Sequence, residues 1–306
     1  MIITVTLNPC VDKTVEVEKF SINRMNRISA SRTDYAGKGI NLSFTLSQLG
    51  HGSVATGFLG EQTSAGYEVV FKKYGVVNDF VYIPGAVRVN TKIIDKSTSE
   101  QTDINESGLS VTKEMKAELL DKIKDYSKDG NIIIFSGSFP AGFCREDFSQ
   151  FLKAVVNGGA KVAADCDGGY LREAVNAGVF LIKPNIYEFE ELAGESLPDI
   201  ESIKNRALKE AQNGIGYAIV SLDKRGAIFA SAGEVFHLPA PKIKRLGSTC
   251  AAGDSLVAGF LAGLLAKKSF LESAKLAMAA SAAAVSMDGT EPPPPELINK
   301  ILNGYL

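Results

Sequence analysis

The sequence contains no tryptophan, two histidines and four cysteines among its 306 residues. The cysteines (Cys10, Cys144, Cys166 and Cys250) are widely spaced and form no CxxC pair. Neither a zinc site nor a disulfide framework is therefore expected, and a reducing cytoplasm fits this usage. His51 and His237 accompany no serine or acid motif, so a Ser-His-Asp hydrolase is poorly supported. His237 falls at the end of a predicted hairpin, formed by 227–230 and 234–237, and is interpreted as structural.

No charge of one sign dominates, and no apolar run is long. The chain has 33 Lys and Arg against 35 Asp and Glu, a formal net charge of −2. A protein that binds nucleic acid regardless of its sequence usually carries a basic excess. The apolar stretch 255–266 is too short to cross a bilayer, which takes about 18 residues. We therefore expect a cytoplasmic protein that binds neither nucleic acid nor membrane.

Short β-branched runs alternate with amphipathic helices over most of the chain. Strands are predicted at 2–7, 53–59, 131–135, 161–165, 180–183 and 217–222, and helices at 40–49, 64–74, 113–127, 145–157, 170–176, 200–213, 254–266 and 270–287. This alternation predicts one α/β domain with a mainly parallel sheet covered on both faces. Two half-exposed strand pairs, around 14–35 and 87–107, predict a small second sheet over one edge.

Polar segments follow several of the predicted strands, at 8–12, 136–138, 183–188 and 248–254. Ligands of open α/β sheets bind at the carboxyl ends of the strands, so these segments are expected to converge. In the last of them, Asp254 opens a predicted helix after three small residues, Ala251, Ala252 and Gly253. A carboxylate there can accept a hydroxyl proton beside N–H groups that suit a transferring phosphate. The alternative, which the local sequence alone favours, is a simple helix N-cap.

A glycine-rich turn at Gly37-Lys38-Gly39 leads into a helix that carries Asn41. It matches neither the Walker A loop, because no Ser or Thr follows the lysine, nor the dinucleotide fingerprint. The lysine and the amide are within reach of a ligand in one interpretation and lie on a surface turn in the other. A dehydrogenase is disfavoured because the glycine fingerprint and its acidic partner are missing.

Two further groups of polar residues are candidates for binding phosphate and metal. Arg88, Asn90 and Lys92 alternate along one predicted strand and so share one face, where they can hold a phosphate or simply be solvated. Asn185 and Glu188 lie three apart at a helix start. They can organise a hydrated Mg²⁺, or Glu188 is a plain first-turn acid.

Taken in order, eight segments resemble the ribokinase-like (phosphofructokinase B) sugar kinases. They are TLNPCVDKT, AGKGIN, GFLG, VRVNTKI with TDINESG, FSGSFPAG, KPNIYEFEEL, VSLDKRGAIF and STCAAGDSLVAGF. They look closest to the branch with 1-phosphofructokinase, tagatose-6-phosphate kinase and the minor 6-phosphofructokinase. The resemblance implies a three-layer α/β sandwich with a mainly parallel sheet and a small β-sheet lid. It also implies a single domain over 1–306, with the lid formed from about 11–36 and 86–108.

The resemblance also implies roles for residues at matching positions. Asp254 matches the catalytic base, and Ala251, Ala252 and Gly253 match the loop before it. Substrate contacts are implied for Asp12, Gly37, Lys38, Asn41, Arg88, Asn90, Lys92, Ser136 and Ser138. Nucleotide contacts are implied for Lys183, Asn185, Ser221, Gly226 and Ser248, and Mg²⁺ binding, through water, for Asn185 and Glu188.

The implied cofactors are ATP and Mg²⁺, with a monovalent cation as an optional third. The implied partners are a phosphorylated ketohexose and a second copy of the chain, paired through the lid. Fructose 1-phosphate is the favoured substrate, and tagatose 6-phosphate or fructose 6-phosphate are alternatives. A non-catalytic sugar-phosphate-binding relative is a further alternative. It is motivated by two departures from the family pattern, Ala251 and Asp223, each at a position where the family has glycine.

Overall fold

The computed structural model describes residues 1–305, and the predicted domain end at 306 lies outside the described residues. The main sheet runs in the order β14-β13-β12-β11-β10-β9-β1-β4-β5, with β6 also paired to β4. All of its pairs are parallel except those of β12 with β13 and β13 with β14. Its strands are β1 (Ile2–Thr6), β4 (Ser53–Gly60), β5 (Val77–Asn78), β6 (Val81–Ile83), β9 (Ile132–Ser136), β10 (Lys161–Asp165), β11 (Leu181–Ile182), β12 (Tyr217–Ser221), β13 (Ala227–Ala230) and β14 (Val235–Leu238).

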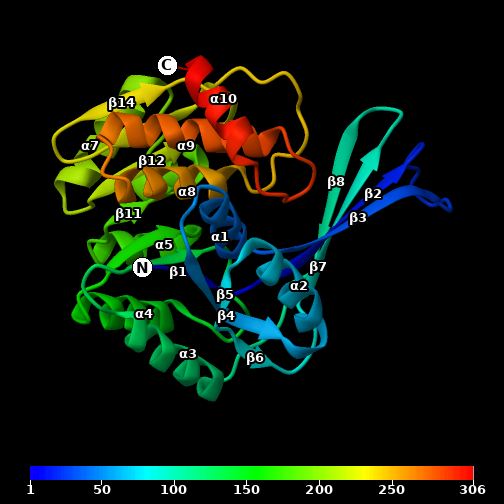
Figure 1. The fold of residues 1–306 in the computed structure, drawn as a ribbon, viewed down its shortest axis with the longest axis horizontal. Coiled ribbons are helices and arrows are strands. Elements are labelled where there is room, and N and C mark those ends of the chain that lie inside the picture. The colour runs from blue at the N-terminus through cyan, green and yellow to red at the C-terminus, as the bar shows by residue number, and fades with distance from the viewer. Residues whose placement is uncertain (306) are drawn as a thin grey trace.

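Helices cover both faces of this sheet, which gives three layers (Figure 1). One face packs against α3 (Lys113–Tyr126), α4 (Arg145–Asn157), α5 (Gly168–Asn176), α6 (Ile186–Ala193) and α7 (Ile200–Gln212). The other packs against α1 (Lys38–Gln48), α8 (Ala252–Leu265), α9 (Phe270–Val285) and α10 (Pro295–Tyr305). A third cluster joins α1 to α2 (Ser64–Tyr74). The predicted three-layer fold class is confirmed.

A second, four-stranded sheet projects from one end of the molecule (Figure 1). Its order is β3-β2-β7-β8, from β2 (Cys10–Val17), β3 (Ile28–Ala36), β7 (Arg88–Asp95) and β8 (Glu100–Asn105). The polar segment predicted at 8–12 is only partly a connection between strands, because β2 begins at Cys10 rather than near residue 14. One face of the strand is directed to the site described below and is therefore polar. For that reason the start of the strand lacks the apolar residues by which a strand is predicted.

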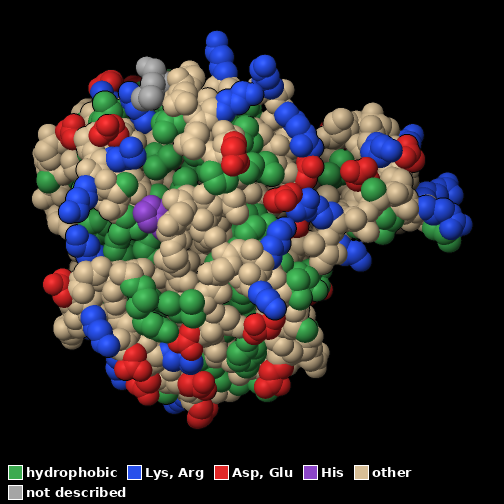
Figure 2. Space-filling model, in the orientation of Figure 1, with side chains coloured by type: hydrophobic (Ala, Val, Ile, Leu, Met, Phe, Trp, Pro, Cys, Tyr) green, Lys and Arg blue, Asp and Glu red, His purple; other side chains and the backbone are tan. Residues whose placement is uncertain are grey.

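The far end of the projecting sheet is both basic and apolar on its surface. Figure 2 shows Lys and Arg side chains gathered there beside hydrophobic ones. Ile22 and Met25 are each 80% exposed on the β2–β3 connection. Apolar side chains that gather on a surface often mark a site of interaction, whereas single exposed apolar residues are common on any protein. Among the described residues, no helix combines the length and apolarity that crossing a bilayer requires.

Candidate active site

A cavity of about 460 Å³ lies between the second sheet and the carboxyl ends of the main-sheet strands. Small-molecule sites have volumes of roughly 300–1,000 Å³. Its walls include many of the predicted site residues: Asp12, Gly37, Lys38, Asn41, Arg88, Asn90, Lys92, Ser138, Lys183, Ala251, Gly253 and Asp254. The other predicted residues are not among its lining: Ser136, Asn185, Glu188, Ser221, Gly226, Ser248 and Ala252.

Asp254 lies in the first turn of α8 but does not cap it. The helix begins at Ala252, two residues earlier than predicted, and Ala251 occupies the N-cap position without a side-chain hydrogen bond. The N-cap alternative is therefore wrong. Asp254 is only 4% exposed, and Asn41 Nδ2 donates a hydrogen bond to its Oδ2 at 2.9 Å. The carboxylate is thus held in a fixed orientation at the cavity wall.

The pKa of the Asp254 carboxyl group is raised to near neutral pH. Burial raises its pKa from 3.8 to about 7, and the nearby carboxylate of Asp165 adds to the rise. Lys38, the hydrogen bond from Asn41 and Lys183 oppose the shift. A general base works best when its pKa lies near the working pH, so this environment suits proton transfer at neutral pH.

The loop before the base contains a strained alanine. Ala251 has φ 59° and ψ 2°, a left-handed conformation that glycine adopts without steric cost. Among the described residues, the N–H groups of Gly253 and Asp254 meet no backbone carbonyl. Both donors are therefore available to an anion at this helix start.

Replacing Ala251 by glycine is expected to raise the free energy of unfolding by about 1 kcal/mol, because the left-handed strain is removed. Denaturant titration measures the change. Ala252→Gly is the matched control, since Ala252 begins the helix without a positive φ and glycine there should not stabilise the protein. A loss of stability in Ala251→Gly would contradict the strain.

Asp165 joins two lysines at the base of the cavity. Its Oδ1 lies 3.3 Å from Lys38 Nζ and 3.2 Å from Lys183 Nζ, and Ser136 Oγ lies 3.5 Å from its Oδ2. Asp165 is only 1% exposed. Burial would raise its pKa, but Lys183 and Lys38 outweigh burial and lower it, so Asp165 is ionised. In turn, Asp165 raises the pKa of Lys38.

Glycines bring α1 close enough to β1 to place Lys38 in this cluster. A Cβ on Gly37 would lie 2.7 Å from Thr6 Cγ2, and one on Gly39 would lie 2.6 Å from Thr6 Oγ1. Gly37 also has φ 155°, which side-chain-bearing residues rarely adopt. The glycine-rich turn is therefore required by packing against β1, which the sequence pattern alone did not indicate.

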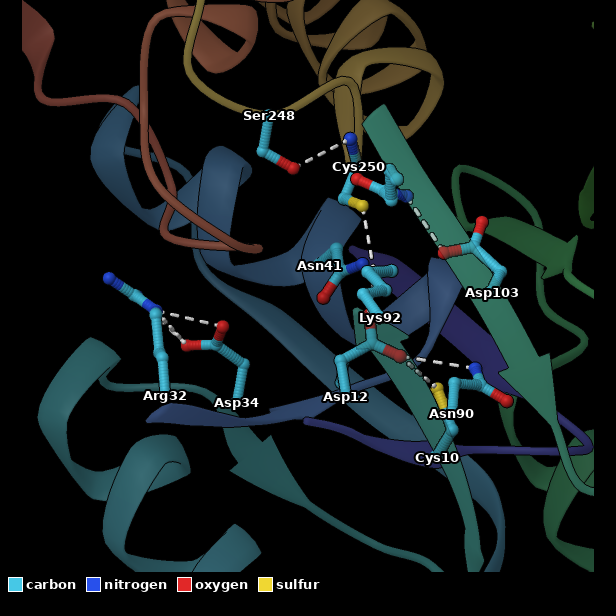
Figure 3. A network of polar contacts seen from close by, with 12 residues as sticks. Cys10, Asp12, Arg32, Asp34, Asn41, Asn90, Lys92, Asp103, Ser248 and Cys250 are labelled. Carbon is cyan, nitrogen blue, oxygen red and sulfur yellow. Dashed lines mark hydrogen bonds and ion pairs between the residues drawn. The ribbon is translucent and has the colours of Figure 1, made fainter. Parts of the chain in front are cut away.

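A second polar cluster lies on the cavity side of the projecting sheet (Figure 3). Asn90 Nδ2 donates to Asp12 Oδ1 at 3.1 Å, and Lys92 Nζ lies 2.9 Å from Asp12 Oδ2. Lys92 Nζ also lies 2.8 Å from the Sγ of Cys250. The interpretation of this strand as an ordinary solvated face is therefore wrong for Asn90 and Lys92.

Arg88 extends the polar wall toward Ser138. Its Nη2 donates to Ser138 Oγ at 3.3 Å, and Asn8 Nδ2 donates to the same oxygen at 3.2 Å. Four residues of the cavity wall each have a buried polar atom with no hydrogen-bond partner within residues 1–305: Thr6 Oγ1, Asn41 Oδ1, Arg88 Nε and Asn90 Oδ1. Because such groups are costly to leave unpaired, they point to a polar ligand.

Asn185 and Glu188 form a capping box at the start of α6. Glu188 N donates to Asn185 Oδ1 at 3.0 Å, and Asn185 N donates to Glu188 Oε2 at 2.7 Å. Within residues 1–305 no three His, Cys, Asp or Glu side chains are grouped to hold a metal ion. A Mg²⁺ near Glu188 would therefore need phosphate and water for most of its shell, as hydrated Mg²⁺ usually does.

The remaining predicted nucleotide residues shape loops rather than line the cavity. Ser248 Oγ accepts from Cys250 N at 3.1 Å, and Ser221 N donates to Pro184 O at 3.0 Å. Gly226 has φ 94°. Asp223, the second departure from the family pattern, has φ 51° and an exposed side chain. Its carboxylate therefore faces solvent, and its backbone takes the left-handed conformation open to glycine.

The sequence interpretation assigned no role to several cavity residues, above all Asp165. Five of the others lie within the segments that were expected to converge: Asn8, Cys10, Gly137, Thr249 and Cys250. The rest lie outside those segments: Thr6, Ala36, Asp103, Asn105, Asp167 and Thr290. Asp165 is the last residue of β10. The rule that ligands bind at strand carboxyl ends could have identified it, as it identified the segment 136–138.

Known proteins resemble this chain both in sequence and in fold. A 1-phosphofructokinase of Rhodobacter capsulatus is 34% identical over 96% of this chain and 93% of its own length. The structure of Escherichia coli phosphofructokinase-2 in complex with substrates and products superposes with a TM-score of 0.94, at 24% identity over 99% of both chains. Arabidopsis thaliana ribokinase, complexed with ribose and ATP, gives a TM-score of 0.77 at 20% identity over 98% of both chains.

These two structures establish that the chain has the ribokinase-like fold. At 24% and 20% identity, structural likeness shows the fold and nothing more. The family is established by sequence. The model of the pfkB family carbohydrate kinases matches residues 5–297, nearly the whole chain. The resemblance inferred from the eight segments is thereby confirmed: this chain belongs to the pfkB family of carbohydrate kinases.

Proposed function

We propose that this ATP-dependent sugar-phosphate kinase converts fructose 1-phosphate to fructose 1,6-bisphosphate. The observation that carries the proposal is a single cavity in which a buried carboxylate of raised pKa, Asp254, shares the walls with the cations Arg88 and Lys92. A phosphorylated acceptor needs both a base and a phosphate contact. The Rhodobacter relative, at 34% identity, carries the name 1-phosphofructokinase.

In the proposed reaction, Asp254 accepts the proton of the acceptor hydroxyl as that oxygen attacks the γ-phosphorus. Asn41 holds the carboxylate through its Nδ2, and its unpaired Oδ1 can accept a sugar hydroxyl. The N–H groups of Gly253 and Asp254 stabilise charge on the moving phosphoryl group. Lys38 and Lys183, held by Asp165, supply positive charge on the cavity floor.

The substrate's own phosphate is proposed to bind at Arg88 and Lys92, with Ser138, Asn90 and Asp12 positioning the sugar. Arg88 has an unpaired buried Nε that can donate to a phosphate oxygen. This contact lies away from the reacting hydroxyl, so its binding energy serves to orient the acceptor.

The nucleotide is proposed to lie along the segments 183–188, 221–226 and 248–254, with Asn185 and Glu188 holding a hydrated Mg²⁺. Glu188 fits this role because Asn185 N occupies only one of its carboxylate oxygens. When bound, Mg²⁺ neutralises the charge of the nucleotide phosphates. An optional monovalent cation remains part of the proposal. A structure of E. coli phosphofructokinase-2 is of its complex with potassium.

The second sheet is proposed to act as a lid and to pair with a second copy of the chain. Support comes from the exposed apolar residues Ile22 and Met25 at its far end. A structure of E. coli phosphofructokinase-2 is of a tetrameric form. Gel filtration with light scattering tests the pairing. A mass of one chain at micromolar concentration would refute it.

The experiment that tests the function is a coupled ADP-release assay with Mg-ATP. Fructose 1-phosphate is expected to give the highest kcat/KM, and tagatose 6-phosphate and fructose 6-phosphate are the competing acceptors. A higher kcat/KM for either of these would reassign the substrate. Measurable binding of a sugar phosphate with no turnover on any of the three would favour the non-catalytic relative.

A further inference from the structure

Cys250 lies in the cavity in contact with a cation. It is on the loop just before α8, is partly exposed, and lines the same cavity as Asp254. Its Sγ is 2.8 Å from Lys92 Nζ, and that ammonium group also lies 2.9 Å from Asp12 Oδ2 (Figure 3). An ammonium group at hydrogen-bond distance stabilises negative charge on sulfur, and the thiolate is the nucleophilic form of cysteine.

We propose that Cys250 is a covalent modification site, where small electrophiles or peroxides entering the cavity react with the sulfur beside Lys92 and thereby block the sugar-phosphate site. The assignment of the cavity to a sugar phosphate rests on the proposed function. The reactivity of the thiol does not, so the two parts can fail separately.

The cavity itself is built to admit a small polar molecule. Thr6 and Asn41, two of its lining residues, are only 1% and 6% exposed, and each carries a buried side-chain oxygen with no hydrogen-bond partner among the described residues. These unpaired oxygens are independent of the thiol, and a bound polar molecule is the kind of partner that such groups require. A small reagent can therefore reach Cys250, which is more exposed than either residue.

The other three cysteines lack this combination. Cys10 and Cys166 are 6% and 1% exposed, and burial raises the pKa of both thiols. Cys144 is exposed, but its Sγ lies 3.1 Å from the carboxylate of Asp147 rather than beside a cation. Cys250 alone among these four joins access to a neighbouring ammonium group.

The chemistry is balanced in both proposed reactions. With iodoacetamide, sulfur attacks the methylene carbon, a C–S bond forms, the C–I bond breaks and iodide leaves, while the thiol proton passes to solvent. With hydrogen peroxide, sulfur attacks one oxygen and the O–O bond breaks. The sulfur is oxidised to sulfenic acid, and the departing hydroxide takes up the thiol proton as water. Either product places new atoms beside Lys92, where the substrate phosphate is proposed to bind.

Labelling in a Cys144→Ser background tests the site. Iodoacetamide at pH 7 is expected to add one carbamidomethyl group, found at Cys250 by peptide mass spectrometry, and activity should fall in step with labelling. Replacing the cation by Lys92→Met should slow labelling about tenfold. The matched control Lys13→Met, which removes an exposed lysine of the neighbouring strand β2, should leave the rate unchanged.

Three results would overturn the proposal. One is that Cys10 or Cys166 is labelled before Cys250. The second is a labelling rate that Lys92→Met does not change, and the third is full activity after complete labelling of Cys250. Dimedone should trap a sulfenic acid at Cys250 after peroxide treatment, and its absence there would overturn the oxidative half. Fructose 1-phosphate should slow alkylation. If labelling is fast but unprotected, the modification site stands and the substrate assignment fails.

Discussion

Asp254→Asn is expected to lower kcat by about 10²- to 10⁴-fold, the usual contribution of a general base. The amide is nearly isosteric, and its oxygen can still accept from Asn41 Nδ2, which donates to the carboxylate at 2.9 Å in the native protein. Positioning is therefore kept while the proton acceptor is lost. Steady-state kinetics measures the fall, and ATP binding by calorimetry should change little. Activity within a few-fold of the native enzyme would remove Asp254 from its role.

The same carboxylate makes the native enzyme sensitive to acid. Because the ionised form accepts the proton, kcat/KM should rise with pH and level off above the Asp254 pKa of about 7. We call this rise the acid limb of the pH profile, and the residual activity of Asp254→Asn should not show it. An acid limb that survives the substitution would arise from the titration of another group.

Stability provides a control that separates lost chemistry from lost folding. The folded-state pKa of Asp254, about 7, lies above its ordinary value of 3.8. Between these values the folded protein binds a proton that the unfolded chain releases, so this group lowers stability as pH rises from about 4 to 7. Asp254→Asn should therefore have a higher Tm than the native enzyme at pH 8. Loss of activity together with a lower Tm would indicate misfolding.

Asp165→Ala is expected to lower the free energy of unfolding by about 3–5 kcal/mol, because it removes one partner of a buried ion pair. Lys183, whose side chain is 6% exposed, would be left with an uncompensated charge, whereas Lys38 at 43% can turn to water. Denaturant titration measures the loss. Asp167→Ala is the matched control, since this exposed carboxylate lines the same cavity and forms no ion pair among the described residues.

Asp165→Asn tests the electrostatic part of the same prediction. The ionised Asp165 helps to raise the pKa of Asp254, while Lys38 and Lys183 lower it. Neutralising Asp165 should therefore move the acid limb of kcat/KM to lower pH. A limb that stays in place or moves upward would show that Asp165 does not act on the base through charge.

The layers of the fold could be predicted because strands and helices carry different apolar periods. The runs at 64–74, 145–157 and 161–165 were bounded correctly, since turn residues or polar ends mark them. The short strands β5 and β6, two and three residues long, are too short for a period to show. The start of β2 was missed because its polar residues serve the cavity rather than the core.

A site residue could be predicted only where the sequence around it indicates its chemical role. Asp254 was identified through the segments around it, and Lys38 through its glycines. Asp165 has no such sequence context. An aspartate at the end of a buried strand is common, and only the folded structure places Lys38 and Lys183 beside this one. The positive φ of Ala251 was equally hidden, since only the family's glycine pattern flagged that position.

The hydrogen bond between Asn41 and Asp254 joins residues 213 positions apart in the chain. A contact of such long range can form only when the chain between the two residues has closed into a loop, which costs conformational entropy. Before that closure, Asp254 is a solvated acid with an ordinary affinity for protons. A chain in which α1 and α8 have not docked thus lacks a competent base, and phosphoryl transfer reports that these two helices have come together.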